Sequence, residues 1–239
     1  MDMCANIITF GHRGAMGHAP ENTLLAFKTA VAMGVDGIEL DVYRSQDGHV
    51  IVSHSDTLDI GGHLYRITKL DLNEIKKIDL GKGQRVPTLD EVIDTMEKLT
   101  NKKVLYSIDL KDVRDGDVYH EVVEKGGIKP RLFTCFESRM FIKKMYRQYA
   151  DLTYVLSIHV NPEGGIEDLD KFDPAMIKVV NIPEKELTKL LVDAIHAKKL
   201  KSFVWDVNEE QRMRELAGWG VDGMYSNYPD MLVRVIKKK

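Results

Sequence analysis

The sequence predicts an α/β protein of the (β/α)8 or TIM barrel type, with a short cap-like insertion after the second strand. Three observations support this fold. Strand-like runs alternate with helix-like stretches, eight such strands can be counted, and 239 residues is the size expected of one barrel. The predicted strands begin near residues 7, 37, 104, 132, 152, 177, 202 and 223. A doubly wound open sheet is the alternative, but no Gly-x-Gly-x-x-Gly follows the first strand.

Composition favours a single domain over residues 1–239, because no linker or low-complexity tract divides the chain. The 34 Lys and Arg residues nearly balance the 37 Asp and Glu residues, so the net charge of −3 gives no reason to expect nucleic acid as a partner. No stretch approaches 18 apolar residues, which argues against stable membrane insertion. Two cysteines, Cys4 and Cys135, cannot form a disulfide framework, so we expect a cytoplasmic protein. A homo-oligomer is left open.

The elements follow one another in the order that a barrel needs. The first strand, residues 7–10, runs into Gly11-His12-Arg13-Gly14, and a helix follows between Thr23 and Gly34. The second strand covers residues 37–42. The later strands are predicted at 104–110, 132–136, 152–160, 177–182, 202–207 and 223–226, and the later helices at 87–99, 119–125, 138–149, 184–199, 209–218 and 231–238.

One segment breaks this alternation. Residues 50–54 are strand-like but follow the second strand too closely for a helical crossover, and Asp47-Gly48 between them is typical of a two-residue hairpin turn. A hairpin centred on that turn pairs residues whose numbers sum to 95, which places His54 opposite Asp41. The polar, weakly periodic residues 55–86 that follow are predicted to form the cap.

Three carboxylates are predicted to converge at the mouth of the barrel. Side chains alternate along a strand, so Glu39 and Asp41 share the inward face of the second strand, and Asp109 has the same orientation in the third. Buried carboxylates repel one another unless a cation lies among them, and an all-oxygen ligand set favours Mg²⁺ or Ca²⁺. The alternative is a network of salt bridges between these acids and the side chains of Arg13, Arg44 and Lys111.

Two histidines are expected beside this cluster. His12 ends the first strand and His54 ends the hairpin, and imidazoles near a metal serve as general acid and base at neutral pH. Arg13 and Lys111 add positive charge suited to phosphate oxygens. Neither Gly-x-Ser-x-Gly nor a Walker motif is present, so these residues indicate metal-assisted phosphoryl chemistry.

The sequence resembles the glycerophosphodiester phosphodiesterases over nearly its whole length and in the same order. The shared segments are His12-Arg13-Gly14-Ala15, Pro20-Glu21-Asn22-Thr23, Glu39-Leu40-Asp41-Val42, Asp47-Gly48, residues 50–54, Pro87-Thr88-Leu89, Asp109-Leu110-Lys111, residues 204–208, Gly220-Val221-Asp222-Gly223 and Tyr228-Pro229-Asp230. The resemblance implies hydrolysis of a glycerophosphodiester to sn-glycerol 3-phosphate and an alcohol, in lipid and glycerol metabolism.

The same resemblance implies roles for the residues of the site. Glu39, Asp41 and Asp109 would hold the metal, His12 and His54 would be the acid–base pair, and Arg13 would hold the phosphate. The nucleophile would be a neighbouring glycerol hydroxyl, giving a cyclic phosphate, or a water molecule.

This chain departs from the family pattern at several positions. The family usually has Glu where this chain has Asp109 and an acid where it has Ser55. Asp206 and Asn227 replace the usual Thr and Asp, which we expect to affect the substrate rim more than the chemistry. Trp205 is expected either to stack on the substrate or to seal the barrel interior. The alternatives to a glycerophosphodiesterase are a related lysophospholipase D or sphingomyelinase D-like enzyme and a catalytically silent phosphodiester-binding barrel.

Overall fold

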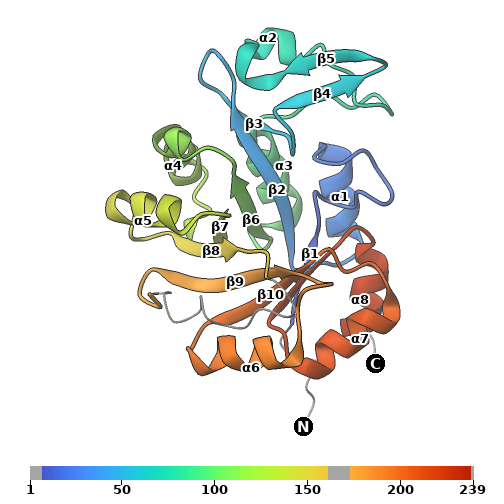
Figure 1. The fold of residues 1–239 in the computed structure, drawn as a ribbon. Coiled ribbons are helices and arrows are strands. Elements are labelled where there is room, and N and C mark those ends of the chain that lie inside the picture. Colours follow the sequence, from blue (N-terminus) through green and yellow to red (C-terminus); the bar gives the residue numbers. More distant parts are fainter. Residues whose placement is uncertain (1–6, 161–172, 238–239) are drawn as a thin grey trace.

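The computed structural model describes residues 7–160 and 173–237 and contains the predicted barrel. Eight parallel strands pair in a closed ring, because β1 pairs with both β11 and β2. The ring runs β1-β11-β10-β9-β8-β7-β6-β2, and the helices lie around it (Figure 1). These strands are β1 Ile8–Gly11, β2 Gly37–Arg44, β6 Leu105–Leu110, β7 Leu132–Phe136, β8 Thr153–Ser157, β9 Ile177–Pro183, β10 Lys201–Trp205 and β11 Gly223–Ser226. The (β/α)8 prediction is therefore confirmed.

A helix occupies each segment where the sequence predicts one. They are α1 Leu24–Ala32, α3 Leu89–Thr100, α4 Gly116–Lys125, α5 Arg139–Gln148, α6 Lys189–Ala197, α7 Glu210–Trp219 and α8 Pro229–Lys237. The prediction of a helix from residue 184 was wrong by several residues. Residues 184–187 instead form a turn, in which the Leu187 N–H donates a hydrogen bond to the Pro183 carbonyl. The helix α6 begins after Thr188, whose side-chain oxygen accepts a hydrogen bond from the Leu191 N–H.

The alternation of side chains along the strands divides the protein into an interior and an outer core. Phe10, Phe203 and Tyr225 fill the barrel interior, where the Phe10 and Tyr225 rings stack with centroids 4.7 Å apart. On β2, Leu40 and Val42 face outward into the larger apolar core. The interior is therefore packed below the mouth, and the polar inward residues lie at the carboxyl ends of the strands.

The hairpin after β2 exists, but its predicted register was wrong by one residue. Val42 pairs with Val52 of β3 (Val50–Val52), so the paired numbers sum to 94 rather than 95. The Ser45 N–H donates to the His49 carbonyl, which leaves three residues in the turn, and Gly48 has φ +95°. Ser53, and not His54 as predicted, therefore lies opposite Asp41. Its N–H donates to the Asp41 carbonyl at 2.9 Å.

Residues 55–86 form the predicted cap, which lies beyond the β2–β3 end of the barrel at the top of Figure 1. It contains the two-stranded sheet of β4 Thr57–Ile60 and β5 His63–Arg66, the turn η1 Ile67–Lys69 and the short helix α2 Leu72–Ile75. Ile67, Ile75 and Val86 pack against Ile51 of β3 in a separate apolar cluster. The cap is thus attached to the hairpin by its own small core.

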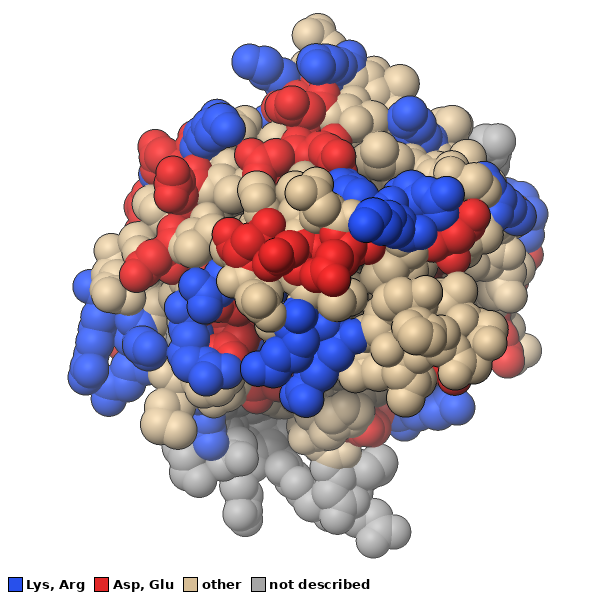
Figure 2. Space-filling view, turned by 90° about the horizontal axis from the view of Figure 1, so that it is seen from above, with Lys and Arg blue, Asp and Glu red and all other residues tan. Residues whose placement is uncertain are grey.

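The surface of the described residues carries both signs of charge. Figure 2 shows Lys and Arg side chains interspersed with Asp and Glu side chains over the face seen from above. None of the described helices has the length and apolar character needed to cross a bilayer. Cys4 lies outside the described residues, and Cys135 is a buried free thiol.

Candidate active site

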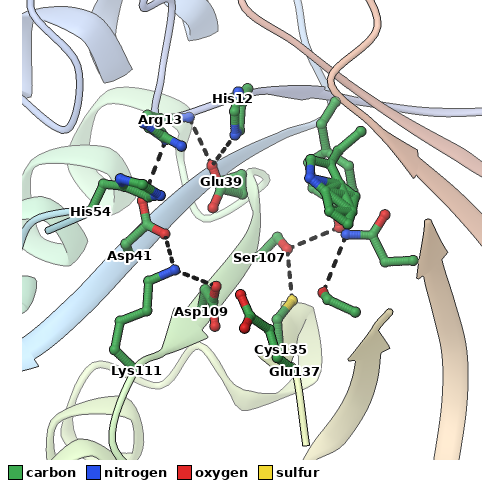
Figure 3. A pocket seen from close by; sticks show the side chains of 14 residues that line it. His12, Arg13, Glu39, Asp41, His54, Ser107, Asp109, Lys111, Cys135 and Glu137 are labelled. Atoms are coloured by element: carbon green, nitrogen blue, oxygen red, sulfur yellow. Dashed lines mark hydrogen bonds and ion pairs between the residues drawn. The ribbon is translucent and has the colours of Figure 1, made fainter. Parts of the chain in front are cut away.

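The structure brings all the residues proposed from the sequence to one pocket at the carboxyl ends of the strands (Figure 3). The pocket has a volume of about 100 Å³. Its lining includes His12, Arg13, Glu39, Asp41, His54, Asp109, Lys111 and Trp205. Active sites of this fold lie at this face of the barrel. Residues from the hairpin and from several strand ends, which are far apart in the sequence, therefore line a single pocket.

The three carboxylates lie on two adjacent strands. Asp41 of β2 is directly paired with Asp109 of β6, and Glu39 lies two residues deeper. The Lys111 ammonium lies 2.8 Å from Asp41 Oδ1 and 2.6 Å from Asp109 Oδ2. The alternative of a salt-bridge network is thus partly realised, but Arg44 is not in it, because its guanidinium pairs with Asp115 at 2.9 Å.

The pKa values of these three acids are shifted by burial and by their charged neighbours. Burial, together with the charge of Asp41, raises the pKa of Glu39 to about 7. Burial also raises the pKa of Asp109 to about 6, against the lowering effect of Lys111. Burial acts to raise the pKa of Asp41 as well, but Lys111 and Asn22 lower it overall. Burial thus disfavours the charged forms of Glu39 and Asp109, whereas Lys111 and Asn22 favour the charged form of Asp41.

This donor set fits a divalent ion of the Mg²⁺ or Ca²⁺ type, because all its ligand atoms are carboxylate oxygens. Among the described residues, the group whose ligand atoms already lie within 4.8 Å of one another is a different one, His120, Glu124 and Asp151. That group is mostly exposed, and the Lys129 ammonium pairs with both of its carboxylates. In the mouth the Lys111 ammonium lies between Asp41 and Asp109, so an ion there would compete with Lys111 for the same oxygens.

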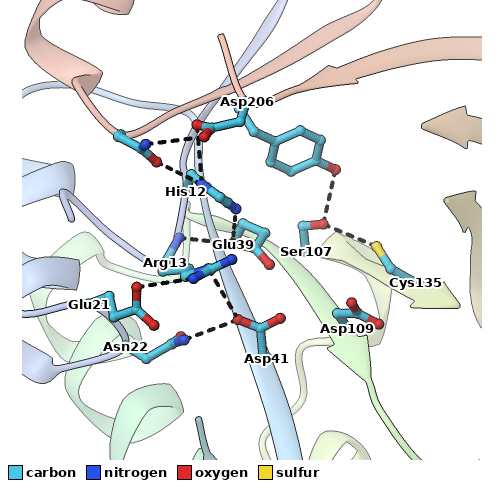
Figure 4. Close-up of polar contacts among 12 residues, drawn as sticks. His12, Arg13, Glu21, Asn22, Glu39, Asp41, Ser107, Asp109, Cys135 and Asp206 are labelled. Carbon is cyan, nitrogen blue, oxygen red and sulfur yellow. Dashed lines mark hydrogen bonds and ion pairs between the residues drawn. The ribbon is translucent and has the colours of Figure 1, made fainter. Parts of the chain in front are cut away.

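The loop after β1 fixes Arg13 against the acids (Figure 4). Arg13 has φ +49°, and its backbone N–H donates to Glu39 Oε2 at 2.8 Å. Its guanidinium pairs with Glu21 at 3.0 Å, and its Nε lies 3.7 Å from Asp41 Oδ2. That Nε is buried and makes no hydrogen bond within the described part of the chain. Arg13 thus adds positive charge to the lining of the pocket, beside Asp41.

Asn22 is a residue of the site that the sequence reasoning did not identify. Its side-chain Nδ2 donates to Asp41 Oδ2 at 3.0 Å, and its backbone N–H donates to the Arg13 carbonyl. Asn22 is 3% exposed and has φ +54°, a conformation that Asn tolerates better than most residues. It therefore joins the loop after β1 to the carboxylate of β2. The Pro-Glu-Asn-Thr segment was a signal that could have identified it.

His12 is oriented by two residues from neighbouring strand ends. Its Nδ1 lies 2.7 Å from Asn227 Oδ1 and 3.4 Å from Asp206 Oδ1, and its Nε2 lies 3.9 Å from Glu39 Oε2. The Asn227 amide donates to Asp206 at 3.3 Å, so its oxygen faces the imidazole and Nδ1 carries the proton. Burial acts to lower the pKa of His12, but Asp206 and Glu39 raise it overall. Positions 206 and 227, which were expected to affect the substrate rim, therefore contact His12 directly.

His54 lines the same pocket and is exposed. Partial burial lowers its pKa, and the charges of Arg13 and Lys111 act in the same direction, against Asp41. Asp56, the first acid after His54, pairs with Arg66 at 2.9 Å and accepts from the Thr68 N–H. That carboxylate therefore stabilises the cap. The two imidazoles of the site thus have pKa values shifted in opposite directions.

Trp205 lies between the pocket and the barrel interior. It lines the pocket, and it also packs against the apolar cluster inside the barrel. His159 lies edge-on to its ring, with centroids 5.5 Å apart. Below these side chains, Ser107 hydrogen-bonds with both the Tyr225 hydroxyl and the Cys135 thiol and forms a polar floor.

A closed (β/α)8 barrel with acids, imidazoles and cationic side chains at one mouth defines an enzyme of the phosphodiesterase class. The chain belongs to the glycerophosphoryl diester phosphodiesterase family, which it matches over residues 12–231. It is 30% identical to the glycerophosphodiester phosphodiesterase of Caldanaerobacter subterraneus over 97% of this chain and 98% of the relative.

Solved structures agree with the fold. The Thermotoga maritima glycerophosphodiester phosphodiesterase has a TM-score of 0.80 at 25% identity, covering 96% of this chain and 98% of its own. An Oleispira antarctica phosphodiesterase, solved with the product sn-glycerol-3-phosphate, has a TM-score of 0.87 at 22% identity and covers 98% of each chain. The protein is therefore an enzyme of the glycerophosphodiester-hydrolysing family.

Proposed function

We propose that this enzyme hydrolyses glycerophosphodiesters to sn-glycerol 3-phosphate and an alcohol in a reaction that depends on Mg²⁺ or Ca²⁺. The observation that carries the proposal is the convergence of two imidazoles, three carboxylates and two cationic side chains on one pocket. The product bound to the Oleispira antarctica phosphodiesterase supports the same product here. Glu39, Asp41 and Asp109 would hold the ion, and a bound divalent ion supplies positive charge to a nonbridging phosphate oxygen.

His12 and His54 would carry the protons. Both line the pocket that contains the carboxylates, and their pKa values are shifted in opposite directions, as suits one charged and one neutral imidazole. One accepts the proton of the nucleophile, which is a glycerol hydroxyl or water, and the other donates a proton to the leaving alkoxide. Asn227 and Asp206 keep the His12 Nε2 directed into the pocket.

Arg13 and Lys111 would bind the phosphate. Arg13 and Lys111 both line the pocket, and each lies beside Asp41. Both add positive charge where the transition state gains negative charge. Trp205, at the end of β10, offers a flat apolar surface for the glycerol carbons.

We also infer that residues 1–239 act as one domain. The cap core packs directly on Ile51 of the hairpin, and the Lys82 ammonium donates to the His18 carbonyl at 2.9 Å. These contacts support the cap as an insertion and not as a separate unit. A single cooperative thermal transition is the expected behaviour.

The test is a steady-state assay with glycerophosphocholine and with lysophosphatidylcholine. We expect turnover of glycerophosphocholine, loss of that turnover in EDTA and recovery when Mg²⁺ or Ca²⁺ is added back. Preference for lysophosphatidylcholine would favour the lysophospholipase D alternative. Absence of turnover of either substrate with either ion would favour the silent barrel, and turnover unaffected by EDTA would contradict the role of the metal.

A further inference from the structure

A second and larger cavity adjoins the catalytic pocket. Its volume is about 580 Å³, within the range of roughly 300–1,000 Å³ that small-molecule sites occupy. Four residues line both cavities: His54, Asp109, Lys111 and Glu137. The larger cavity continues beyond them between Tyr43 of β2 and the start of α5. A phosphodiester centred on the carboxylates can therefore place one of its two substituents in the catalytic pocket and the other in this cavity.

The second cavity contains one carboxylate, that of Glu137, which is not part of the ion pairs around the catalytic pocket. The Lys111 ammonium lies 2.6 Å from Asp109 and 2.8 Å from Asp41, so the charges of these residues belong to the catalytic pocket. Glu137 follows β7 directly and is exposed, and it makes no ion pair with any residue in the described ranges 7–160 and 173–237. Figure 3 shows it beside Asp109. One carboxylate is therefore left to interact with a bound molecule.

The walls of the cavity include aromatic rings. Tyr43 and Phe141 are both partly buried and face the cavity from β2 and α5, and Phe136 closes it at the end of β7. An aromatic face attracts a cation, most strongly a quaternary ammonium that is removed from water. Aromatic walls beside an unpaired carboxylate are the arrangement that recognises such a group.

We propose that this cavity binds the alcohol part of the substrate and selects a cationic alcohol, of the choline or ethanolamine type, through Glu137, Tyr43 and Phe141. The inference rests on the proposed function, because it takes the phosphodiester to be centred on the neighbouring carboxylates. In this proposal the second cavity, and not the catalytic residues, determines which alcohol group of the substrate is preferred.

The test compares kcat/KM for glycerophosphocholine and glycerophosphoethanolamine with kcat/KM for glycerophosphoglycerol, whose alcohol is neutral. We expect the wild-type enzyme to prefer the cationic substrates by about tenfold, which corresponds to about 1.4 kcal/mol. Glu137→Gln should reduce that ratio to within about threefold, and Phe141→Leu should reduce it for choline more than for ethanolamine. Glu121→Gln, at an exposed site on α4, is the matched control and should keep the wild-type ratio.

A second measurement avoids turnover of the cationic substrate. Choline should inhibit hydrolysis of glycerophosphoglycerol competitively in the wild-type enzyme and at least about fivefold more weakly in Glu137→Gln. Equal kcat/KM for all three substrates in the wild type, or an equal loss for all three in Glu137→Gln, would overturn the inference while leaving the phosphodiesterase function intact. If no substrate is hydrolysed with either ion, the proposed function fails, and calorimetric titration of choline into both proteins still decides whether Glu137 binds a cation.

Discussion

The Nδ1 atom of His12 lies 2.7 Å from the Oδ1 atom of Asn227, although 215 residues separate the two in the chain. The contact forms because β1 and β11 are neighbouring strands, with Gly11 paired to Ser226. Each of the two residues directly follows one member of that pair. The closure of the barrel therefore brings the imidazole and the amide together.

Removal of this contact should impair catalysis more than binding. Asn227→Ala should lower kcat by about ten- to a hundredfold, since a side chain that orients a functional imidazole is lost. KM for glycerophosphocholine should change little, and Asn227→Asp, which keeps an acceptor oxygen, should retain more activity. Steady-state kinetics of the three proteins measures the effect. A rise in KM with unchanged kcat would mean that Asn227 contacts the substrate instead.

Both imidazoles should be needed for turnover. His12→Ala and His54→Ala should each lower kcat by about two to four orders of magnitude, because each removes one proton carrier. Calorimetric titration with Mg²⁺ or Ca²⁺ should show that ion binding persists in both variants. Exposed His49, on the hairpin turn, provides the control substitution His49→Ala. Near-wild-type turnover in His54→Ala would show that the two-histidine assignment is wrong.

Asp41 should determine ion affinity. Asp41→Asn keeps the size of the side chain but removes a charge from the centre of the cluster, so the Kd for Mg²⁺ or Ca²⁺ should rise by at least about tenfold. Circular dichroism would confirm that the variant folds. The matched control is Glu124→Gln in the exposed group around Lys129, which should leave the Kd unchanged. Equal ion affinity in Asp41→Asn and wild type would contradict the carboxylate site.

Stability without metal should fall as the pH rises. Burial and the charge of Asp41 raise the pKa of Glu39 from 4.5 to about 7, so its contribution to stability is present below pH 4.5 and is lost as the pH rises through about 7. In EDTA, the decrease in Tm between about pH 5 and pH 8 should be smaller in Glu39→Gln than in the wild type. Excess Mg²⁺ or Ca²⁺ at pH 8 should raise the Tm of the wild type more than that of the variant. If the Tm of the wild type and of Glu39→Gln depended on pH in the same way in EDTA, the raised pKa of Glu39 would be contradicted.

Away from the site, Glu97 should stabilise the fold. Both of its oxygens accept from the Arg131 guanidinium, at 2.9 and 2.6 Å, and the Tyr106 hydroxyl donates to it at 2.8 Å. Burial acts to raise its pKa, but Arg131 and Tyr106 lower it overall, so this stabilisation is present at neutral pH and is lost as the pH falls below about 4.5. Glu97→Gln should lower the free energy of unfolding, measured with urea, by about 1.5–3 kcal/mol at pH 7 and by less at pH 3. An equal loss of unfolding free energy at pH 7 and pH 3 would contradict an ion pair between Glu97 and Arg131.

The sequence by itself determined the barrel and most of the residues at its mouth. Strand period and the spacing of eight strands predict which side chains point inward, because alternation along a strand is a local property of the backbone. Glu39, Asp41 and Asp109 could be assigned to the interior in this way, and all the proposed site residues do line one pocket. The resemblance of the motifs added the glycerol part of the substrate.

The tertiary structure decided the contacts between elements. The hairpin register followed from a three-residue turn at Gly48, which Asp47-Gly48 alone does not specify. Asn227 contacts His12, and Arg44 pairs with Asp115 instead of with the acids of the site. Both contacts depend on which strand ends become neighbours when the ring closes. The cavity beside Glu137 likewise forms only where β2, β6, β7, α5 and the end of the hairpin come together. Residue type and local periodicity set the direction of a side chain, whereas its partner is set by packing between distant segments.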